Sequence, residues 1–230
     1  ADQGPLIDVM AHLGSLFAVL VYFRKDVAAV IAGKLDVLRG RMTSGAKLLL
    51  LIIAATPPVL IVGAGLYLTG AAEAMRSPVV IAWATLIFAA PLWLADHFAP
   101  RTREIEVMRW RDAALIGLAQ ALALVSGASR SGVTMTAGRA LGLTREAAAR
   151  FSMLMAIPVI AAFGLLAGIE LARGAAPGAS LTDGLIVAAL SFLAAWAAIA
   201  VLMRVVERIG FLPFVLYRVA LAAAILWVLS

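Results

Sequence analysis

Long apolar runs are the feature that most constrains this sequence. A helix that crosses the hydrocarbon core of a bilayer needs about 20 consecutive, mostly apolar residues. Six segments meet or approach that length: Leu6–Phe23, Ala46–Leu68, Pro78–Ala95, Ala147–Leu171, Asp183–Met203 and Pro213–Leu229. Their number and length predict an all-α polytopic membrane protein with six spanning helices.

The composition supports this fold class and excludes several kinds of site. Of the 230 residues, 64% are hydrophobic and only 14% are charged, whereas soluble domains are nearer to about 45–50% apolar. We attribute the net charge of +6 to basic loops beside a bilayer and expect no nucleic-acid partner, because no basic patch is interleaved with aromatic residues. The absence of cysteine excludes disulfides and thiolate metal sites.

The distribution of Lys and Arg predicts how the spans are oriented. Residues 24–47 contain six of these cations against two aspartates, so this connection is predicted to lie in the cytoplasm. The other connections then alternate: 69–77 and 173–182 lie outside, and 101–111 and 204–210 lie inside. This alternation requires the stretch between Arg111 and Arg145 to return to the side from which it entered.

That stretch predicts a re-entrant helical hairpin at residues 113–143. Its first apolar part, Ala113–Val125, would reach only about 20 Å as a helix, short of the roughly 30 Å hydrocarbon core. A polar turn and a second short apolar part, Val133–Leu143, follow. Non-helical backbone at membrane depth is tolerated only where protein or a water-filled cavity surrounds it.

Three spans precede the hairpin and three follow it, which predicts an inverted-topology repeat. The first repeat would comprise residues 1–112 and the second 113–230, within a single membrane domain. In such folds the binding site forms near the midplane, where the repeats meet. The repeat also predicts a matching hairpin before Leu6, which this sequence does not contain.

The turn of the hairpin contains the motif Gly-Ala-Ser-Arg-Ser-Gly-Val-Thr at residues 127–134. Gly127 and Gly132 would let the backbone approach a ligand closely. A helix that begins near Gly132 would point its free N–H groups at the turn, which favours an anion. The guanidinium of Arg130 matches two phosphate oxygens.

Three hydroxyls complete this predicted phosphate site. Ser129, Ser131 and Thr134 could donate hydrogen bonds to the same anion, since Thr134 would lie in the first turn of the helix. The alternative is that the small residues merely allow close helix packing. An arginine between two serines, within a broken helix, favours the phosphate site.

The run from Gly117 to Ile160 closely resembles the second signature region of undecaprenyl-diphosphate phosphatases of the bacitracin-resistance type. That family reads Pro-Gly-x-Ser-Arg-Ser-Gly-x-Thr and continues as Glu-x-x-Ala-Arg-Phe-Ser. The continuation is matched by Glu146, Ala149, Arg150, Phe151 and Ser152. Segments 8–14 and 213–218 resemble other parts of the family, so the resemblance covers essentially the whole chain. Ser126 stands where the family usually has proline.

The resemblance implies an enzyme that hydrolyses undecaprenyl diphosphate to undecaprenyl phosphate and phosphate. This reaction recycles the lipid carrier of cell-wall synthesis at the outer face of the bacterial inner membrane. By the same resemblance, Arg130 would bind the diphosphate and stabilise charge that develops during transfer. Ser129, Ser131 and Thr134 would orient its oxygens, with Gly127 and Gly132 adding substrate contacts, and no nucleophile is assigned.

Two further residues are predicted to contribute to substrate binding. Gln120 is the lone strongly polar residue of the first half-helix and could line the site or bond across helices. His12 follows Asp8 by four residues, so both lie on one helix face. His12 could contribute to the cavity wall or form an interfacial pair with Asp8.

The family's first signature, an acidic helix followed by a Ser/Gly/His turn, would come before Ala1. Its glutamates are implied to bind a divalent metal, Mg²⁺ or Ca²⁺, so we expect no metal ligand in this chain and incomplete catalysis by it. Two alternatives therefore stay open: a polyprenyl-phosphate transporter or flippase, and a noncatalytic lipid-phosphate binder. The sequence also leaves a homodimer open.

Overall fold

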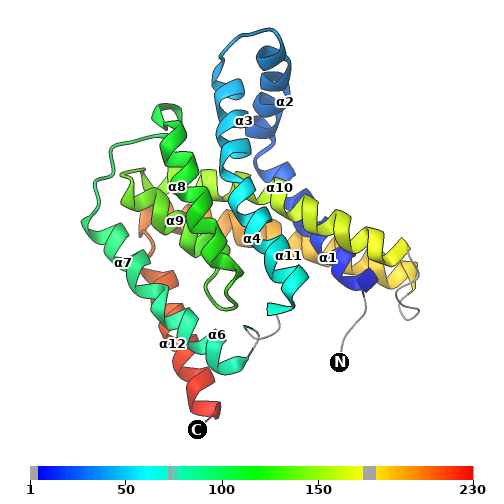
Figure 1. The fold of residues 1–230 in the computed structure, drawn as a ribbon. Coiled ribbons are helices and arrows are strands. Elements are labelled where there is room, and N and C mark those ends of the chain that lie inside the picture. Colours follow the sequence, from blue (N-terminus) through cyan, green and yellow to red (C-terminus); the bar gives the residue numbers. More distant parts are fainter. Residues whose placement is uncertain (1–4, 72–74, 76, 173–179, 230) are drawn as a thin grey trace.

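A computed structural model of the chain describes residues 5–71, 75, 77–172 and 180–229 (Figure 1). Within these residues the regular structure is helical, apart from an isolated bridge between Arg103 and Leu143. The α-helices are α1 Pro5–Tyr22, α2 Arg24–Leu38, α3 Ser44–Ala55, α4 Pro57–Thr69, α6 Pro78–Ile87, α7 Ala89–Phe98, α8 Trp110–Ala121, α9 Arg130–Ala140, α10 Arg145–Ala172, α11 Leu181–Arg208 and α12 Leu212–Leu229. Short 3-10 turns form at Ile105–Val107 (η1) and Leu122–Leu124 (η2).

Five helical segments of the described residues are long and apolar enough to cross a membrane. They are Ser44–Thr69, Pro78–Phe98, Arg145–Ile169, Thr182–Arg208 and Leu212–Leu229. These segments confirm the all-α polytopic membrane class and five of the six predicted spans. Within Thr182–Arg208 only 6% of the apolar window is buried inside the protein, as expected for a helix whose apolar surface faces lipid.

The first predicted span differs from the expectation. The helix α1 ends at Tyr22, and α2 leaves it at an angle of 87°, so a sixth crossing exists only if the bent pair counts as one span. The basic segment 24–47 is therefore not a simple connection, because α2 folds back against α3 (Figure 1). A Cβ on Gly33 would lie 2.3 Å from the Ala46 nitrogen, so glycine permits this close packing.

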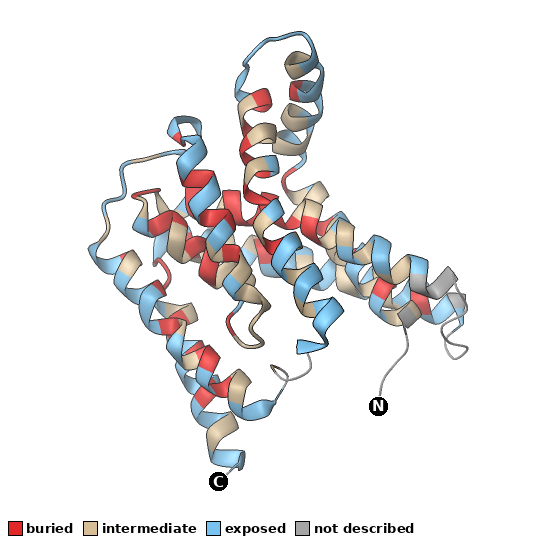
Figure 2. Cartoon of the chain, viewed as in Figure 1, coloured by how far each residue is buried: buried red, intermediate tan, exposed pale blue. Residues whose placement is uncertain are grey.

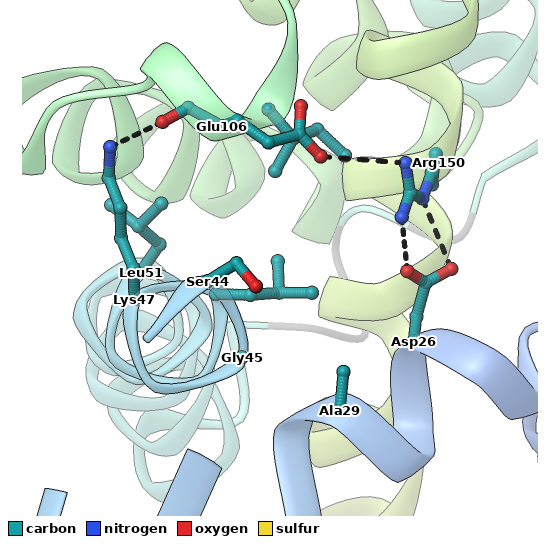
Figure 3. Close-up of a pocket in the computed structure, with 10 residues that line it drawn as sticks. Asp26, Ala29, Ser44, Gly45, Lys47, Leu51, Glu106 and Arg150 are labelled. Atoms are coloured by element: carbon teal, nitrogen blue, oxygen red, sulfur yellow. Dashed lines mark hydrogen bonds and ion pairs between the residues drawn. The ribbon is translucent and has the colours of Figure 1, made fainter. Parts of the chain in front are cut away.

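The base of this helical pair is joined to α10 by an ion pair (Figure 3). The Arg150 guanidinium donates to both carboxylate oxygens of Asp26 on α2, one of them at 3.1 Å from Nε. Arg150 also lies 3.9 Å from the Glu106 carboxylate, while Lys47 Nζ donates to the Glu106 carbonyl at 2.5 Å. These contacts link α2, α3, η1 and α10.

The remaining helices enclose a central hairpin made of α8 and α9. The helix α8 packs on α3 and α4, whereas α9 packs on α7 and α10. The helix α12 packs on α6 and α7, and α1 lies along α10 and α11. Buried residues are concentrated around α9 and the adjoining part of α10, while the outer faces are exposed (Figure 2). The hairpin is thus held by protein on several sides.

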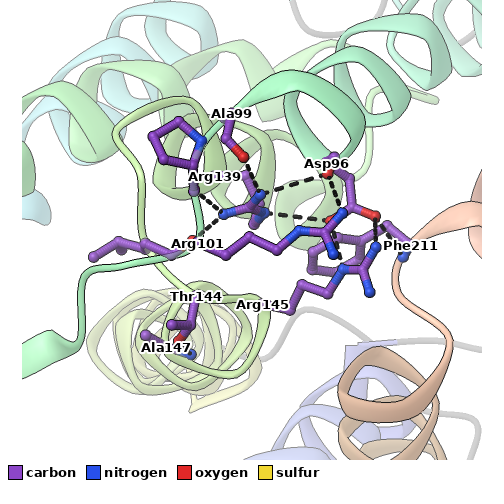
Figure 4. A network of polar contacts seen from close by, with 10 residues as sticks. Asp96, Ala99, Arg101, Arg139, Thr144, Arg145, Ala147 and Phe211 are labelled. Atoms are coloured by element: carbon purple, nitrogen blue, oxygen red, sulfur yellow. Dashed lines mark hydrogen bonds and ion pairs between the residues drawn. The ribbon is translucent and has the colours of Figure 1, made fainter.

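A buried ionic cluster fixes the end of the hairpin opposite its turn (Figure 4). Asp96 on α7 accepts two hydrogen bonds of 2.7 Å from Arg145 and one of 3.3 Å from Arg139 Nε. The backbone N–H of Phe211 also donates to Asp96 at 3.3 Å. Arg139 is fully buried and donates to the carbonyls of Ala99, Pro100 and Leu143. The cluster connects α7, α9, α10 and the start of α12.

Candidate functional site

The two half-helices and the polar turn predicted for residues 113–143 are present in the structure. The helix α8 continues into η2, and residues 125–129 lead into α9. The second helix begins at Arg130, two residues before the expected start near Gly132. Arg130 and Ser131 therefore belong to the first helical turn and not to the loop. The depth of this hairpin in a membrane stays a prediction.

Ser129 caps the N-terminus of α9 in an unusual backbone conformation. Its φ is 68° and ψ 110°, and no other non-glycine residue of the described chain has a positive φ. Such a conformation typically costs about 1–3 kcal/mol and is concentrated at functional sites. In return, the Ser129 Oγ accepts a hydrogen bond from the Gly132 N–H at 3.3 Å. The early helix start follows from this cap.

Gly127 sets the path of the turn that leads to Ser129. Its φ is +93°, a region that favours glycine, and a Cβ there would lie 2.4 Å from the carbonyl oxygen of Ile81. The turn therefore packs directly against α6. The close approach of the backbone at Gly127 is to protein in this structure, and its predicted contact with a ligand stays a prediction.

A cavity of about 190 Å³ lies beside the first turn of α9. Its polar lining includes Ser129, Ser131 and Gly132 from the motif, together with Tyr217 and Arg218 from α12. The other lining residues are apolar: Leu92, Met135, Leu202, Phe211 and Phe214. Hydroxyls, a helix N-terminus and a guanidinium thus meet an apolar wall in one cavity. This combination suits an anionic group attached to an apolar chain.

Arg218 is a site residue that the sequence analysis missed. Its Nη2 donates to the carbonyls of Thr85 and Gly127, both at 3.0 Å. Its Nη1 lies 3.7 Å from the position that a Cβ on Gly132 would occupy, and its buried Nε has no partner within the described structure. An arginine inside an apolar span is itself a signal of function, and that signal could have found Arg218.

Arg130 and Thr134 lie on a different side of α9, facing α10. The Arg130 Nη1 donates to the Ser152 carbonyl at 2.9 Å. The Thr134 hydroxyl lies 2.6 Å from the Ser152 hydroxyl and also donates to the Arg130 carbonyl at 2.9 Å. Neither residue is among those that line the cavity. The structure therefore brings Ser129, Ser131 and Gly132 together with Arg218, and the ligand roles of Arg130 and Thr134 stay predictions.

The two additional predicted substrate contacts are also placed away from the cavity lining. Gln120 is fully buried, and neither atom of its amide has a hydrogen-bond partner within the described residues. His12 is exposed on α1, where its Nδ1 lies 2.7 Å from the backbone carbonyl of Asp8. The contact that the structure gives His12 is thus to backbone and not to the Asp8 carboxylate. Both substrate-binding roles stay predictions.

A divalent metal does not fit the residues that line this cavity. Among the described residues its lining contains no carboxylate, and it places a guanidinium next to the positive end of a helix dipole. In the part of the chain that the structure describes, no three His, Asp or Glu side chains are grouped to hold a metal ion. We therefore derive no chemical step through a metal.

The fold and the cavity define a class: polytopic α-helical membrane proteins with a site suited to an anionic, lipid-linked group. The family model described as "Bacitracin resistance protein BacA" matches residues 1–224. This chain belongs to that family, and the predicted resemblance is confirmed.

Several curated proteins are similar along nearly the whole chain. "Undecaprenyl-diphosphatase" of Maricaulis maris (strain MCS10) is 66% identical over 228 residues, which cover 98% of this chain and 85% of that protein. The protein of the same description from Dinoroseobacter shibae (strain DSM 16493 / NCIMB 14021 / DFL 12) is 49% identical over 227 residues, with the same coverage. That of Hyphomonas neptunium (strain ATCC 15444) is 47% identical over 233 residues, covering 96% of this chain and 81% of the relative.

Proposed function

We propose that this protein hydrolyses undecaprenyl diphosphate to undecaprenyl phosphate and inorganic phosphate, and so recycles the lipid carrier of cell-wall synthesis. The relatives described as undecaprenyl-diphosphatase support the substrate and the reaction. The structural observation that carries the proposal is the cavity where Ser129, Ser131 and Arg218 meet an apolar wall. Few ligands other than a lipid phosphate would use both halves of such a lining.

The terminal phosphate is proposed to bind at the polar end of the cavity. There the free N–H groups of the first turn of α9, the hydroxyls of Ser129 and Ser131 and the Arg218 Nη1 can donate to its oxygens. The first isoprene units would pack against Phe211 and Phe214. In the overall reaction the bridging P–O bond breaks, the oxygen of one water ends on the released phosphate, and the lipid keeps one phosphate. The two protons of that water end on the phosphate products or in solvent. Fixed donors stabilise the charge that develops on the departing groups.

Arg130 is proposed to reach the diphosphate from the neighbouring face of α9. Its hydrogen bond to the Ser152 carbonyl uses one of the five N–H donors that a guanidinium carries. The contact holds the side chain in place, and the remaining donors stay available for phosphate oxygens. Thr134 would act through Ser152, since the two hydroxyls are hydrogen-bonded.

The protein is proposed to lie in the inner membrane, with its site open to the periplasm. The turn of the hairpin lies far from the basic pair α2–α3 (Figure 1). A Cβ on Gly63 would lie 3.7 Å from Leu124, and Gly127 packs on Ile81. Gly63 and Ile81 are within six residues of the connection 69–77, or roughly 9 Å along a helix. Because that connection is predicted to lie outside, the hairpin tip approaches the outer surface although its base enters from the cytoplasm.

The test measures phosphate release from undecaprenyl diphosphate by the purified full-length protein in detergent, and binding of the lipid in the same sample. Ser131→Ala should reduce turnover by about tenfold or more, because one donor to the developing charge is lost. Ser15→Ala is the matched control, since the Ser15 hydroxyl donates to the Ala11 carbonyl within α1, away from the cavity. Both variants remove one hydroxyl.

Two results would replace this function, and a third would place the reaction elsewhere in the protein. Binding without phosphate release would indicate a noncatalytic lipid-phosphate binder. Movement of polyprenyl phosphate across vesicles without release would indicate a transporter. Equal turnover by Ser131→Ala and the wild type would show that the cavity takes no part in the reaction. Dependence on Mg²⁺ or Ca²⁺ and a homodimeric state stay predictions, to be checked by chelation with EDTA and by analytical ultracentrifugation.

A further inference from the structure

A second basic cavity lies at the base of the hairpin, where α8 begins and α9 ends. Its volume is about 590 Å³, and Arg103, Arg109, Arg111 and Asp112 contribute its charged lining. Three guanidinium groups face one carboxylate, so the lining carries an excess of positive charge. This cavity shares no lining residue with the one beside Ser129.

The carboxylate of this cavity is already occupied by protein donors. The Arg103 Nη2 donates to Asp112 at 2.5 Å, and the backbone N–H of Arg109 donates at 2.8 Å. Burial raises the pKa of Asp112, but the hydrogen bonds from Arg103 and from the Arg109 backbone outweigh this effect and lower it. Asp112 is therefore ionised, and its carboxylate already accepts hydrogen bonds from these protein donors. The side chains of Arg109 and Arg111 are exposed, and no ion pair within the described residues includes either one.

An exposed apolar stripe begins directly below Arg111. Leu115, Leu118 and Leu122 follow it at spacings of four, three and four residues, which place them on one helix face. Their exposed fractions are 39%, 58% and 51%. Trp110, also exposed, lies next to the arginines, as tryptophans do at the boundary between headgroups and acyl chains. Arginines followed by an apolar stripe are complementary to a phospholipid, whose anionic headgroup is followed by an apolar acyl chain.

We infer that this cavity binds the phosphodiester headgroup of an anionic phospholipid through Arg109 and Arg111, with an acyl chain along Leu115, Leu118 and Leu122. The charge of the lining selects an anionic headgroup, as basic pockets at membrane surfaces do. The stripe favours a lipid over a free phosphate, because a free phosphate has no apolar part that could contact these leucines. The bound lipid contacts both the start of α8 and, through Leu141, the end of α9.

The experiment compares lipid retention by the purified full chain and by two double variants. Each is equilibrated with equal amounts of phosphatidylglycerol and phosphatidylcholine, and the retained lipids are counted by native mass spectrometry. Arg109→Gln with Arg111→Gln should lower the ratio of anionic to neutral lipid by about thirtyfold. Arg24→Gln with Lys25→Gln removes the same charge from exposed positions on α2 and should leave the ratio unchanged.

A second arm separates the lipid from a soluble anion. Leu118→Ser should also weaken phosphatidylglycerol retention, and inorganic phosphate should not displace the lipid. Size-exclusion profiles equal to that of the wild type show that each variant is folded. The inference is overturned if Arg109→Gln with Arg111→Gln retains the anionic lipid as well as the wild type does. It is equally overturned if inorganic phosphate competes and Leu118→Ser has no effect.

Discussion

The Arg218 Nη2 lies 3.0 Å from the carbonyl oxygen of Gly127, so the last helix holds the turn that carries the Ser-Arg-Ser motif. The same guanidinium contacts Thr85 on α6 and faces the first turn of α9. One side chain therefore both fixes the turn and supplies positive charge to the cavity. Substitutions around it can separate the contribution of the turn from that of the charge.

Replacing Arg218 by lysine should separate charge from geometry. Lysine keeps the positive charge, but its ammonium cannot bridge two carbonyls and also point at a phosphate as a planar guanidinium does. We expect turnover to fall by about 100-fold or more. Phosphate release is the measurement, and Arg204→Lys on α11 is the matched control, because Arg204 does not line the cavity. Wild-type turnover by Arg218→Lys would show that charge alone suffices.

Arg130→Ala should abolish turnover while leaving the protein folded. The side chain makes one hydrogen bond to the Ser152 carbonyl, whose loss costs about 0.5–1.5 kcal/mol. Thermal unfolding and phosphate release are measured on the same preparation. If turnover persists in a folded Arg130→Ala protein, Arg130 has no direct role at the diphosphate and its contact with α10 is structural.

Gly127→Ala should destabilise the protein and reduce activity together. The new Cβ would lie 2.4 Å from the Ile81 carbonyl, in addition to the cost of a positive φ of about 1 kcal/mol. Gly40→Ala provides the control, because Gly40 has a φ of +69° but nothing lies within 4 Å of its added Cβ. The melting temperature of Gly127→Ala should fall clearly below that of Gly40→Ala. Equal melting temperatures would mean that the turn moves freely away from α6.

The Thr134–Ser152 contact should behave as a coupled pair. Thr134→Val leaves the Ser152 hydroxyl without its partner in a buried position and should cost about 1–3 kcal/mol. Ser152→Ala in addition removes the orphaned group, so the double variant should be more stable than the sum of the single changes predicts. Denaturant unfolding in mixed micelles measures the cycle. Strict additivity would show that the two hydroxyls do not interact.

Asp96→Asn should destabilise the protein more than Thr134→Val does. Asp96 is paired with the buried Arg139 and the partly buried Arg145, and breaking a buried ion pair typically costs about 3–5 kcal/mol. Asp36→Asn is the control, since Asp36 accepts a hydrogen bond from Thr43 at the exposed end of α2. Protein yield and melting temperature are the measurements. A melting temperature unchanged from the wild type would mean that the arginines find other partners.

The sequence was most informative where a property of the chain is local. The spans follow from apolar length, and the half-helices of the hairpin follow from two short apolar runs around a polar turn. The start of α9 at Arg130 was not predictable, because it depends on the left-handed backbone of Ser129. No local propensity favours that conformation for serine.

Features that depend on distant contacts were missed. Nothing in the amino-acid pattern indicates that α2 packs on α3, because the close approach depends on glycines in two different helices. The partners of Asp96 lie 43, 49 and 115 residues away along the chain. Arg218 is held beside the cavity by a hydrogen bond to the carbonyl of Gly127, which lies 91 residues away along the chain. In each case the partner is set by tertiary packing, which periodicity and charge counts do not report.

The Asp96 cluster has a consequence for motion. It fastens the C-terminal end of α9, and Arg103 adds a second fastening there by donating to both the Leu141 carbonyl and Asp112. With that end held, we expect a ligand that enters beside Ser129 to be accommodated mainly by residues 122–129 and by the side chains that line the cavity on α9 and α12. We therefore expect conformational adjustment during turnover to be larger at the turn of the hairpin than at the base that these ion pairs hold.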